Sequence, residues 1–112
     1  MVTKEELSRF NEIINMSKEV IIVTHQFPDL DAIGSSLALY HQLLKKGIKT
    51  TLYSPNKIDK QFHFLPGAKN FKTKLRTENP DVIIAIDSAT RERIDGYKKL
   101  DQYIDIPIII SI

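Results

Sequence analysis

Two kinds of hydrophobic periodicity alternate along this chain. Helical spacing covers residues 3–17, which Thr3 opens with a capping-box sequence, and Asp31 to Lys46, which Gly47 ends. The remaining apolar runs are short and rich in β-branched residues, as in strands buried on both faces. They are Val20 to Thr24, Ile48 to Ser54, Asp81 to Asp87 and Ile106 to Ile112. The alternation predicts an α/β fold: a mostly parallel sheet flanked by helices, with right-handed crossovers.

The connecting segments are less regular. Residues 55–67 are polar and contain prolines, so we expect one short helical turn there, and residues 96–103 should form a short helix. The last strand contains five isoleucines that need cover on both faces, yet the chain stops within it. We therefore expect residues 1–112 to be the first part of a longer protein, incomplete at the C-terminus.

Composition narrows the class of protein. A length of 112 residues suffices for one hydrophobic core and leaves no room for a second domain. The net charge of +2 is a small excess, and we take it to be spread along the chain. It therefore argues neither for nor against a polyanionic partner. Since cysteine is absent, any metal ion must be held by histidine and carboxylates. The polar N-terminus and the lack of an apolar run of about 20 residues predict a cytoplasmic protein with no membrane partner.

The candidate chemistry gathers where the predicted strands end. His25 follows the first strand, Asp29 and Asp31 lie in the loop beyond it, and Asp87 ends a later strand. Ligands of open α/β sheets bind at the carboxyl ends of the strands. One imidazole and three carboxylates suit a hard or borderline cation such as Mn²⁺ or Mg²⁺.

Each residue also has a plainer interpretation. Asp29 alone fits a turn residue after Pro28, Asp31 the N-cap of the next helix, and Asp87 a cap of the turn that follows it. His25 alone fits an ordinary polar residue at a strand end. These interpretations do not explain why all four residues share one edge, which favours a metal site.

Several nearby residues are candidates for phosphate contacts. Gly34 permits close approach to the strand or to a phosphate, and Ser35 and Ser36 could donate hydrogen bonds at the helix N-terminus; a packed helix start is the alternative. Arg91 and Arg93 suit either a substrate phosphate or a solvated surface. We assign His41 and His63 to no site.

Residues 23–36 read Val-Thr-His-Gln-Phe-Pro-Asp-Leu-Asp-Ala-Ile-Gly-Ser-Ser. This string resembles the first motif of the DHH phosphoesterase family, His-x-x-Pro-Asp-x-Asp-Ala-x-Gly-Ser. Residues 82–88 resemble the second motif, and residues 108–112 are similar to the strand that leads into the namesake Asp-His-His triad, which this sequence lacks. The family includes RecJ-type exonucleases and small bacterial enzymes that degrade oligoribonucleotides and dephosphorylate 3′-phosphoadenosine 5′-phosphate. The compact start of this chain resembles the latter.

The resemblance implies an N-terminal catalytic domain with two Mn²⁺ ions, Mg²⁺ being an alternative. His25 and Asp29 would hold one ion, Asp31 the other, and Asp87 would bridge them, which makes Asp31 and Asp87 the catalytic pair. The second ion would also need a histidine of the missing triad and a later aspartate. Leu30 stands where the family commonly has glycine, so the loop geometry should differ there.

The implied reaction is two-metal hydrolysis of short oligonucleotides or nucleotide phosphoesters. We expect residues 1–112 alone to be inactive, and a homodimer is compatible with the sequence. A non-catalytic binding remnant is the main rival. A receiver-type phosphoacceptor domain is a weaker rival, because no lysine ends a later strand of this chain. A haloacid-dehalogenase-type phosphatase is also disfavoured, because its first acid directly ends the strand, whereas four residues separate Thr24 from Asp29.

Overall fold

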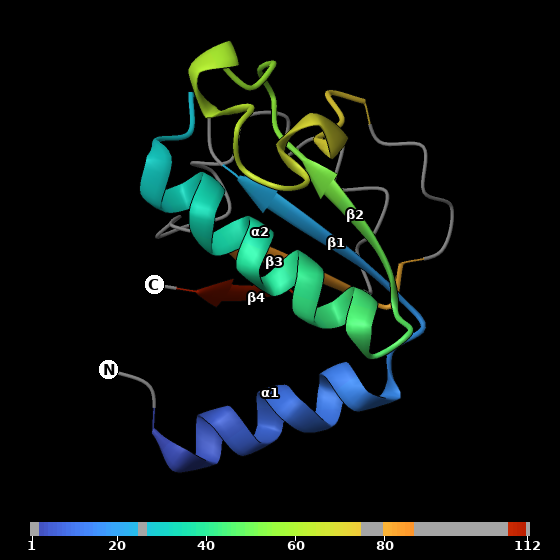
Figure 1. Cartoon of the computed structure of the whole chain (residues 1–112). Coiled ribbons are helices and arrows are strands. Elements are labelled where there is room, and N and C mark those ends of the chain that lie inside the picture. Colours follow the sequence, from blue (N-terminus) through green and yellow to red (C-terminus); the bar gives the residue numbers. More distant parts are fainter. Residues whose placement is uncertain (1–2, 25–26, 75–79, 87–107, 112) are drawn as a thin grey trace.

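The structure, a computed structural model, describes residues 3–24, 27–74, 80–86 and 108–111. Its elements are α1 (Lys4–Met16), β1 (Glu19–Thr24), α2 (Leu30–Lys45), β2 (Lys49–Tyr53), two 3-10 turns, η1 (Lys60–Phe62) and η2 (Ala68–Asn70), then β3 (Val82–Ile86) and β4 (Ile108–Ser111) (Figure 1). The predicted α/β class is confirmed. The helix expected over residues 96–103 lies outside the described residues.

Capping side chains and a glycine mark the ends of the helices. The Thr3 hydroxyl accepts a hydrogen bond from Glu6 N at 3.1 Å and begins α1. Gly47, with φ of 78°, follows the last turn of α2, a conformation that glycine adopts without strain. Among the described residues, no helix has the length and apolar character needed to cross a bilayer.

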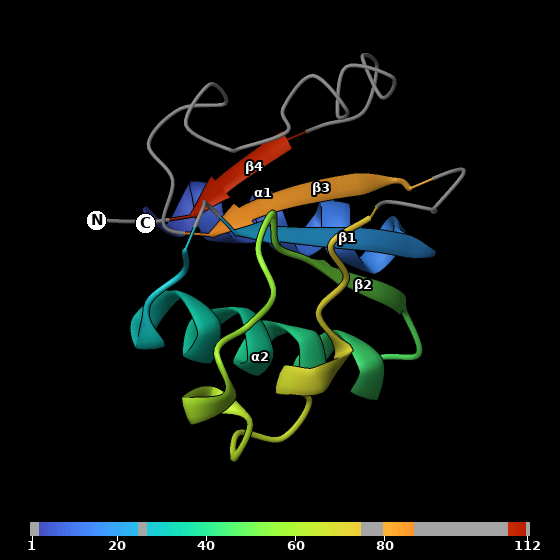
Figure 2. The same cartoon turned by 90° about the horizontal axis from the view of Figure 1, so that it is seen from above.

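The described strands form one sheet in the order β2-β1-β3-β4, and each neighbouring pair is parallel (Figure 2). From β1 the chain crosses to β2 on one side, and later elements add β3 and β4 on the other side. The strand order therefore reverses between β1 and β3. In open α/β sheets this reversal point, at the carboxyl ends of the strands, is where ligands bind.

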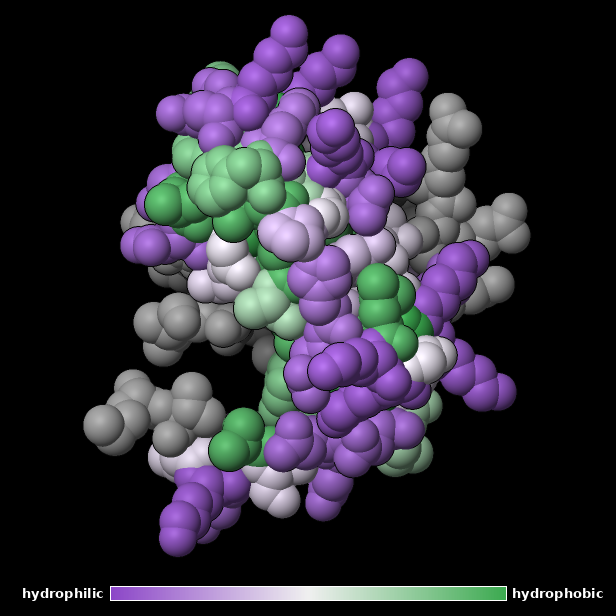
Figure 3. Space-filling model, viewed as in Figure 1, coloured by the Kyte–Doolittle hydropathy of each residue, from purple (hydrophilic) through white to green (hydrophobic). Residues whose placement is uncertain are grey.

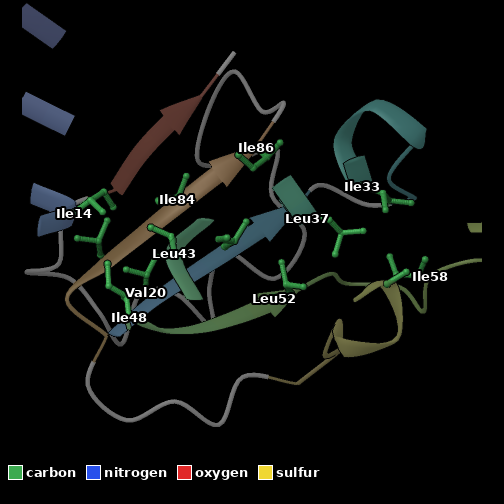
Figure 4. Packing of buried hydrophobic residues seen from close by; sticks show 13 residues of the cluster. Ile14, Val20, Ile33, Leu37, Leu43, Ile48, Leu52, Ile58, Ile84 and Ile86 are labelled. Atoms are coloured by element: carbon green, nitrogen blue, oxygen red, sulfur yellow. The ribbon is translucent and has the colours of Figure 1, made fainter. Parts of the chain in front are cut away.

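The core lies between this sheet and α2. Ile33, Leu37 and Leu43 of α2 belong to one buried cluster with alternate strand residues (Figure 4). The strand members are Val20, Ile22, Leu52, Val82, Ile84 and Ile86. The residues between them, Ile21, Val23, Ile83 and Ala85, are also fully buried. Both faces of β1 and β3 are thus shielded from water, as their uninterrupted apolar sequences predict.

Helix α1 contacts this core from its middle to its end, where Phe10, Ile13 and Ile14 pack against the cluster. Ile14 is buried within the cluster, whereas Leu7 in the first half of the helix is half exposed. Figure 1 shows α2 lying across the front of the sheet and α1 set apart below it.

Asp81 links the amino ends of β1 and β3 through hydrogen bonds. Its carboxylate accepts hydrogen bonds from Lys18 N at 2.6 Å and Glu19 N at 2.9 Å, and its own N–H donates to Glu19 O at 2.7 Å. The hydrogen bonds from Lys18 and Glu19, with the nearby Lys18 charge, hold the pKa of this carboxyl below its usual value. This contact lies at the opposite edge of the sheet from the strand carboxyl ends.

The connection from β2 to β3 is folded back on the sheet and on α2. The predicted helical turn is present as η1, and η2 follows shortly after it. Lys72 N donates to Leu52 O and Ser54 N donates to Lys72 O, so the chain runs beside the end of β2. His41 Nε2 lies 2.8 Å from Pro66 O, which ties the connection to α2. We call residues 57–74 the basic segment because it carries five lysines and one aspartate.

Candidate functional site

The end of β1 and the end of β3 meet at the reversal point of the sheet. Thr24 and Ile86 are paired across the two strands. The next residues in the chain are His25 and Asp87, two of the four predicted metal ligands, and both lie outside the described residues. The other two predicted ligands, Asp29 and Asp31, lie at the start of α2, which follows β1 at this same edge (Figure 1).

Asp29 is the N-cap of α2. Its Oδ1 accepts a hydrogen bond from Ala32 N at 2.8 Å, and its carbonyl accepts one from Ile33 N at 3.0 Å. The interpretation of Asp31 as the N-cap, and of a helix that begins there, is therefore wrong: the helix begins one residue earlier, at Leu30. Capping uses one carboxylate oxygen, and the other keeps its lone pairs for a cation. Capping and metal ligation by Asp29 are thus compatible.

Asp31 lies in the first turn of α2 with its side chain exposed. Within the described residues, no three histidine or acidic side chains come together as a metal cluster. A complete donor set at this edge would combine Asp29 and Asp31 with His25 and Asp87. Three carboxylates and one imidazole match the ligand preference of Mn²⁺ and accommodate Mg²⁺.

The loop before Asp29 is held in an unusual conformation. Phe27 has φ of 50°, a left-handed value that is uncommon for a bulky side chain, and its side chain is 71% exposed. Its N–H donates to Asn56 Oδ1 at 2.9 Å. The Ser54 hydroxyl in turn donates to Asn56 O at 2.7 Å. The turn after β2 therefore holds the loop that leads to Asp29 through a hydrogen bond.

Sequence reasoning did not identify Asn56 as a functional residue. Its sequence signal, an asparagine after a proline at a strand end, indicates a turn and nothing more. Leu30 is the first residue of α2, and among the described residues of this loop Phe27 has the left-handed conformation. The expected difference from the family's loop stays a prediction.

Two of the proposed phosphate contacts need correction. The Ser36 hydroxyl is buried and donates to Ala32 O at 2.7 Å, so it does not serve the helix N-terminus. A Cβ at Gly34 would meet no atom of the described residues within 4 Å, so close approach to the described strands is also wrong. Ser35 is exposed, and Arg91 and Arg93 lie outside the described residues.

The fold and the first motif agree with the comparison to known families. The model described as "DHH family, N-terminal domain" matches residues 19–110. The chain belongs to the DHH family. This membership is the phosphoesterase relationship that residues 23–36 imply, and it makes the receiver-type interpretation wrong.

A solved structure has the same fold. The crystal structure of an exopolyphosphatase-related protein from Bacteroides fragilis superposes with a TM-score of 0.87 and 26% sequence identity. The alignment covers 98% of this DHH-family chain and 35% of the other protein, so the chain spans about a third of that protein's length. A comparison with curated proteins found no match.

Proposed function

We propose that this DHH domain binds Mn²⁺ at the carboxyl edge of the sheet and serves in phosphoester hydrolysis. The proposal is carried by one observation. The paired residues Thr24 and Ile86 end their strands side by side at the reversal point, and α2 begins there with Asp29 and Asp31 in its cap and first turn. His25 and Asp87 come next in the sequence after these two residues, so the chain offers four suitable donors for the end of the sheet at which open α/β folds bind ligands.

The proposed roles follow the family motif residue by residue. His25 and Asp29 would hold one ion, Asp31 would hold the second, and Asp87 would serve both. Bound ions of this kind activate water and neutralise charge on the leaving oxygen. The hydrogen bond from Ala32 N to Asp29 Oδ1 restrains the orientation of this carboxylate and leaves its other oxygen for a cation.

The proposed substrates are short oligonucleotides and nucleoside bisphosphates such as 3′-phosphoadenosine 5′-phosphate. A second candidate is inorganic polyphosphate. It is favoured by the similarity to the exopolyphosphatase-related protein from Bacteroides fragilis and by the five lysines of the basic segment.

Metal binding provides the first test. Mn²⁺ is titrated into the 112-residue protein, with free ion followed by electron paramagnetic resonance. The double variant Asp29→Asn/Asp87→Asn should weaken Mn²⁺ binding by more than about tenfold, since even residues that only support a ligand cost tenfold or more in affinity. The control, Glu5→Gln/Glu12→Gln, removes the same charge from exposed positions of α1. Equal Mn²⁺ affinity in the two double variants would contradict the proposed site.

Product release provides the second test. The protein carrying this domain is supplied with Mn²⁺ and, separately, a short oligoribonucleotide, 3′-phosphoadenosine 5′-phosphate or polyphosphate. Cleavage of either nucleotide substrate supports the proposed function, whereas cleavage of polyphosphate alone selects the second candidate. Metal binding with no hydrolysis of any of the three would identify a binding module instead.

A further inference from the structure

The charge of this chain is not spread evenly. The basic segment has a net charge of +4, from five lysines and one aspartate, while the whole chain has only +2. The remaining residues therefore sum to −2. The positive charge is therefore concentrated in this segment and is not spread along the chain. Figure 3 shows hydrophilic side chains projecting from the top of the molecule, where this segment lies in Figure 1.

The basic segment also forms a pocket. The pocket has a volume of about 290 Å³, near the lower end of the roughly 300–1,000 Å³ typical of small-ligand sites. Its lining includes Lys57, Ile58, His63, Lys69, Phe71 and Thr73. The lining thus combines two lysines, a threonine and an aromatic residue, and none of the described acidic residues belongs to it.

Hydrogen bonds hold the walls of the pocket in place. The ring Nε2 of His63 lies 3.1 Å from Ile58 O, which fixes one wall. Asn70 Nδ2 lies 3.3 Å from Tyr40 Oη, and Phe71 packs partly against the core. Gly67 has φ of 88°, and a Cβ there would come within 3.2 Å of the His41 ring, so the connection lies close against α2. These contacts make the pocket a built part of the fold.

The pocket is connected through the chain to the loop that leads to Asp29. Lys57 directly follows Asn56, whose side chain holds Phe27 just before Asp29. A chain-like substrate bound at the metal site could therefore extend towards the basic segment. Exposed aromatic side chains lie along both parts, Phe27 at 71% and Phe64 at 74% exposure.

We propose that this pocket binds one nucleotide unit of a single-stranded oligonucleotide next to the unit held at the metal site. The base contacts the Phe71 ring, and the phosphate contacts Lys57 and Lys69. A positively charged surface interleaved with aromatic rings is how proteins bind single strands without sequence preference. Polyphosphate uses the lysines but gains nothing from the ring. The inference deepens the proposed function, on which its place beside the metal site rests.

The test measures binding without any metal ion, so its outcome is independent of the candidate metal site. A fluorescently labelled short oligoadenylate is titrated with the 112-residue protein in the presence of EDTA, and anisotropy reports binding. The double variant Lys57→Ala/Lys69→Ala should bind about tenfold or more weakly. The slope of log affinity against log salt should fall by about 0.7 for each lysine that contacts phosphate. The variant Lys4→Ala/Lys45→Ala removes the same charge from exposed positions on α1 and α2 and should bind like the parent.

The variant Phe71→Leu distinguishes a nucleotide from a simple polyanion. Leucine keeps an apolar side chain against the core, so the fold should persist, and oligoadenylate binding should weaken about tenfold through lost stacking. Polyphosphate binding, measured by competition, should not change. The inference is overturned if Phe71→Leu leaves oligoadenylate binding unchanged, if both lysine pairs weaken it equally, or if the parent does not bind in EDTA. In each of these cases the Mn²⁺ titration still judges the metal site separately.

Discussion

The side-chain oxygen of Asn56 lies 2.9 Å from the backbone nitrogen of Phe27, residues 29 positions apart in the chain. The bond supports a left-handed conformation that costs a non-glycine residue about 1–3 kcal/mol. Strain of this size persists only where the surrounding structure enforces it. The turn after β2 is thus a structural support for the loop that leads to Asp29.

Removing this support should weaken metal binding. We expect Asn56→Ala to lower Mn²⁺ affinity about tenfold, because the loop then relaxes and Asp29 is less well oriented. Asn56→Asp retains an acceptor oxygen and should keep the affinity near that of the parent. Adding Phe27→Gly to Asn56→Ala should recover part of the loss, since glycine adopts the left-handed conformation without strain. A calorimetric Mn²⁺ titration of all four proteins measures this, and equal affinities in Asn56→Ala and the parent would refute the support.

Capping and metal binding by Asp29 should be separable. Asparagine is as good an N-cap as aspartate, so Asp29→Asn should unfold at nearly the parent's urea concentration yet lose Mn²⁺ affinity. Asp29→Ala should lose the affinity and also about 1 kcal/mol of stability. Urea titrations read by circular dichroism give the stabilities. If Asp29→Asn retains full Mn²⁺ affinity, the carboxylate has no role beyond the cap.

The open space beside Gly34 allows an alanine to be introduced. Alanine within a helix is more favourable than glycine by about 0.5–1 kcal/mol, and its Cβ meets no described atom within 4 Å. We therefore expect Gly34→Ala to raise the free energy of unfolding by about that amount. Gly47→Ala is the matched control and should destabilise the protein, because φ is 78° there. A destabilised Gly34→Ala would show that the space is filled.

Asp81 predicts an acid-sensitive contribution to stability. Its folded pKa is lowered, chiefly by the hydrogen bond from Lys18 N, so the folded state favours the ionised carboxylate. The contribution is therefore fully present above the unfolded pKa of about 3.9 and is lost as the pH falls through the lower folded pKa. Because this carboxylate is exposed and screened by water, Asp81→Asn should cost less than about 1 kcal/mol at neutral pH, and the difference from the parent should shrink in strong acid. Urea midpoints measured from neutral pH downward test this, and a difference that is constant with pH would contradict it.

The elements could be predicted from local sequence because their signals are local. Thr3 begins α1 through a hydrogen bond with a residue three positions away, and Gly47 ends α2 through its own backbone conformation. The runs of β-branched residues identify strands without information about which strands pair. The order of the strands could not be predicted, because several orders bury the same runs equally well. The structure is needed to see the reversal between β1 and β3: strand β1 pairs on both sides, as Val20 does with Thr50 and with Val82.

In the candidate site, too, the features that depend on nearby residues could be predicted and those that depend on distant residues could not. Asp29 and Asp31 were identified from adjacent residues of one motif, but which residue caps α2 depended on where the helical backbone begins. Asn56 acts across 29 residues and left no sequence signal beyond a turn. The lysines of the basic segment were visible in the sequence, whereas the pocket they line requires residues 57–74 to fold back on α2.

The central place of β1 sets an order of folding events. Val20 pairs with Thr50 and with Val82, so β1, α2 and β2 join through a loop about half as long as the one that brings in β3. Shorter loops close with less entropy loss, and local contacts form first. Asp29 and Asp31 belong to the early unit, while Asp87 follows the strand that docks late. An ion that needs all of them would bind only after the folding transition state, so Mn²⁺ should slow unfolding and leave the rate of folding almost unchanged.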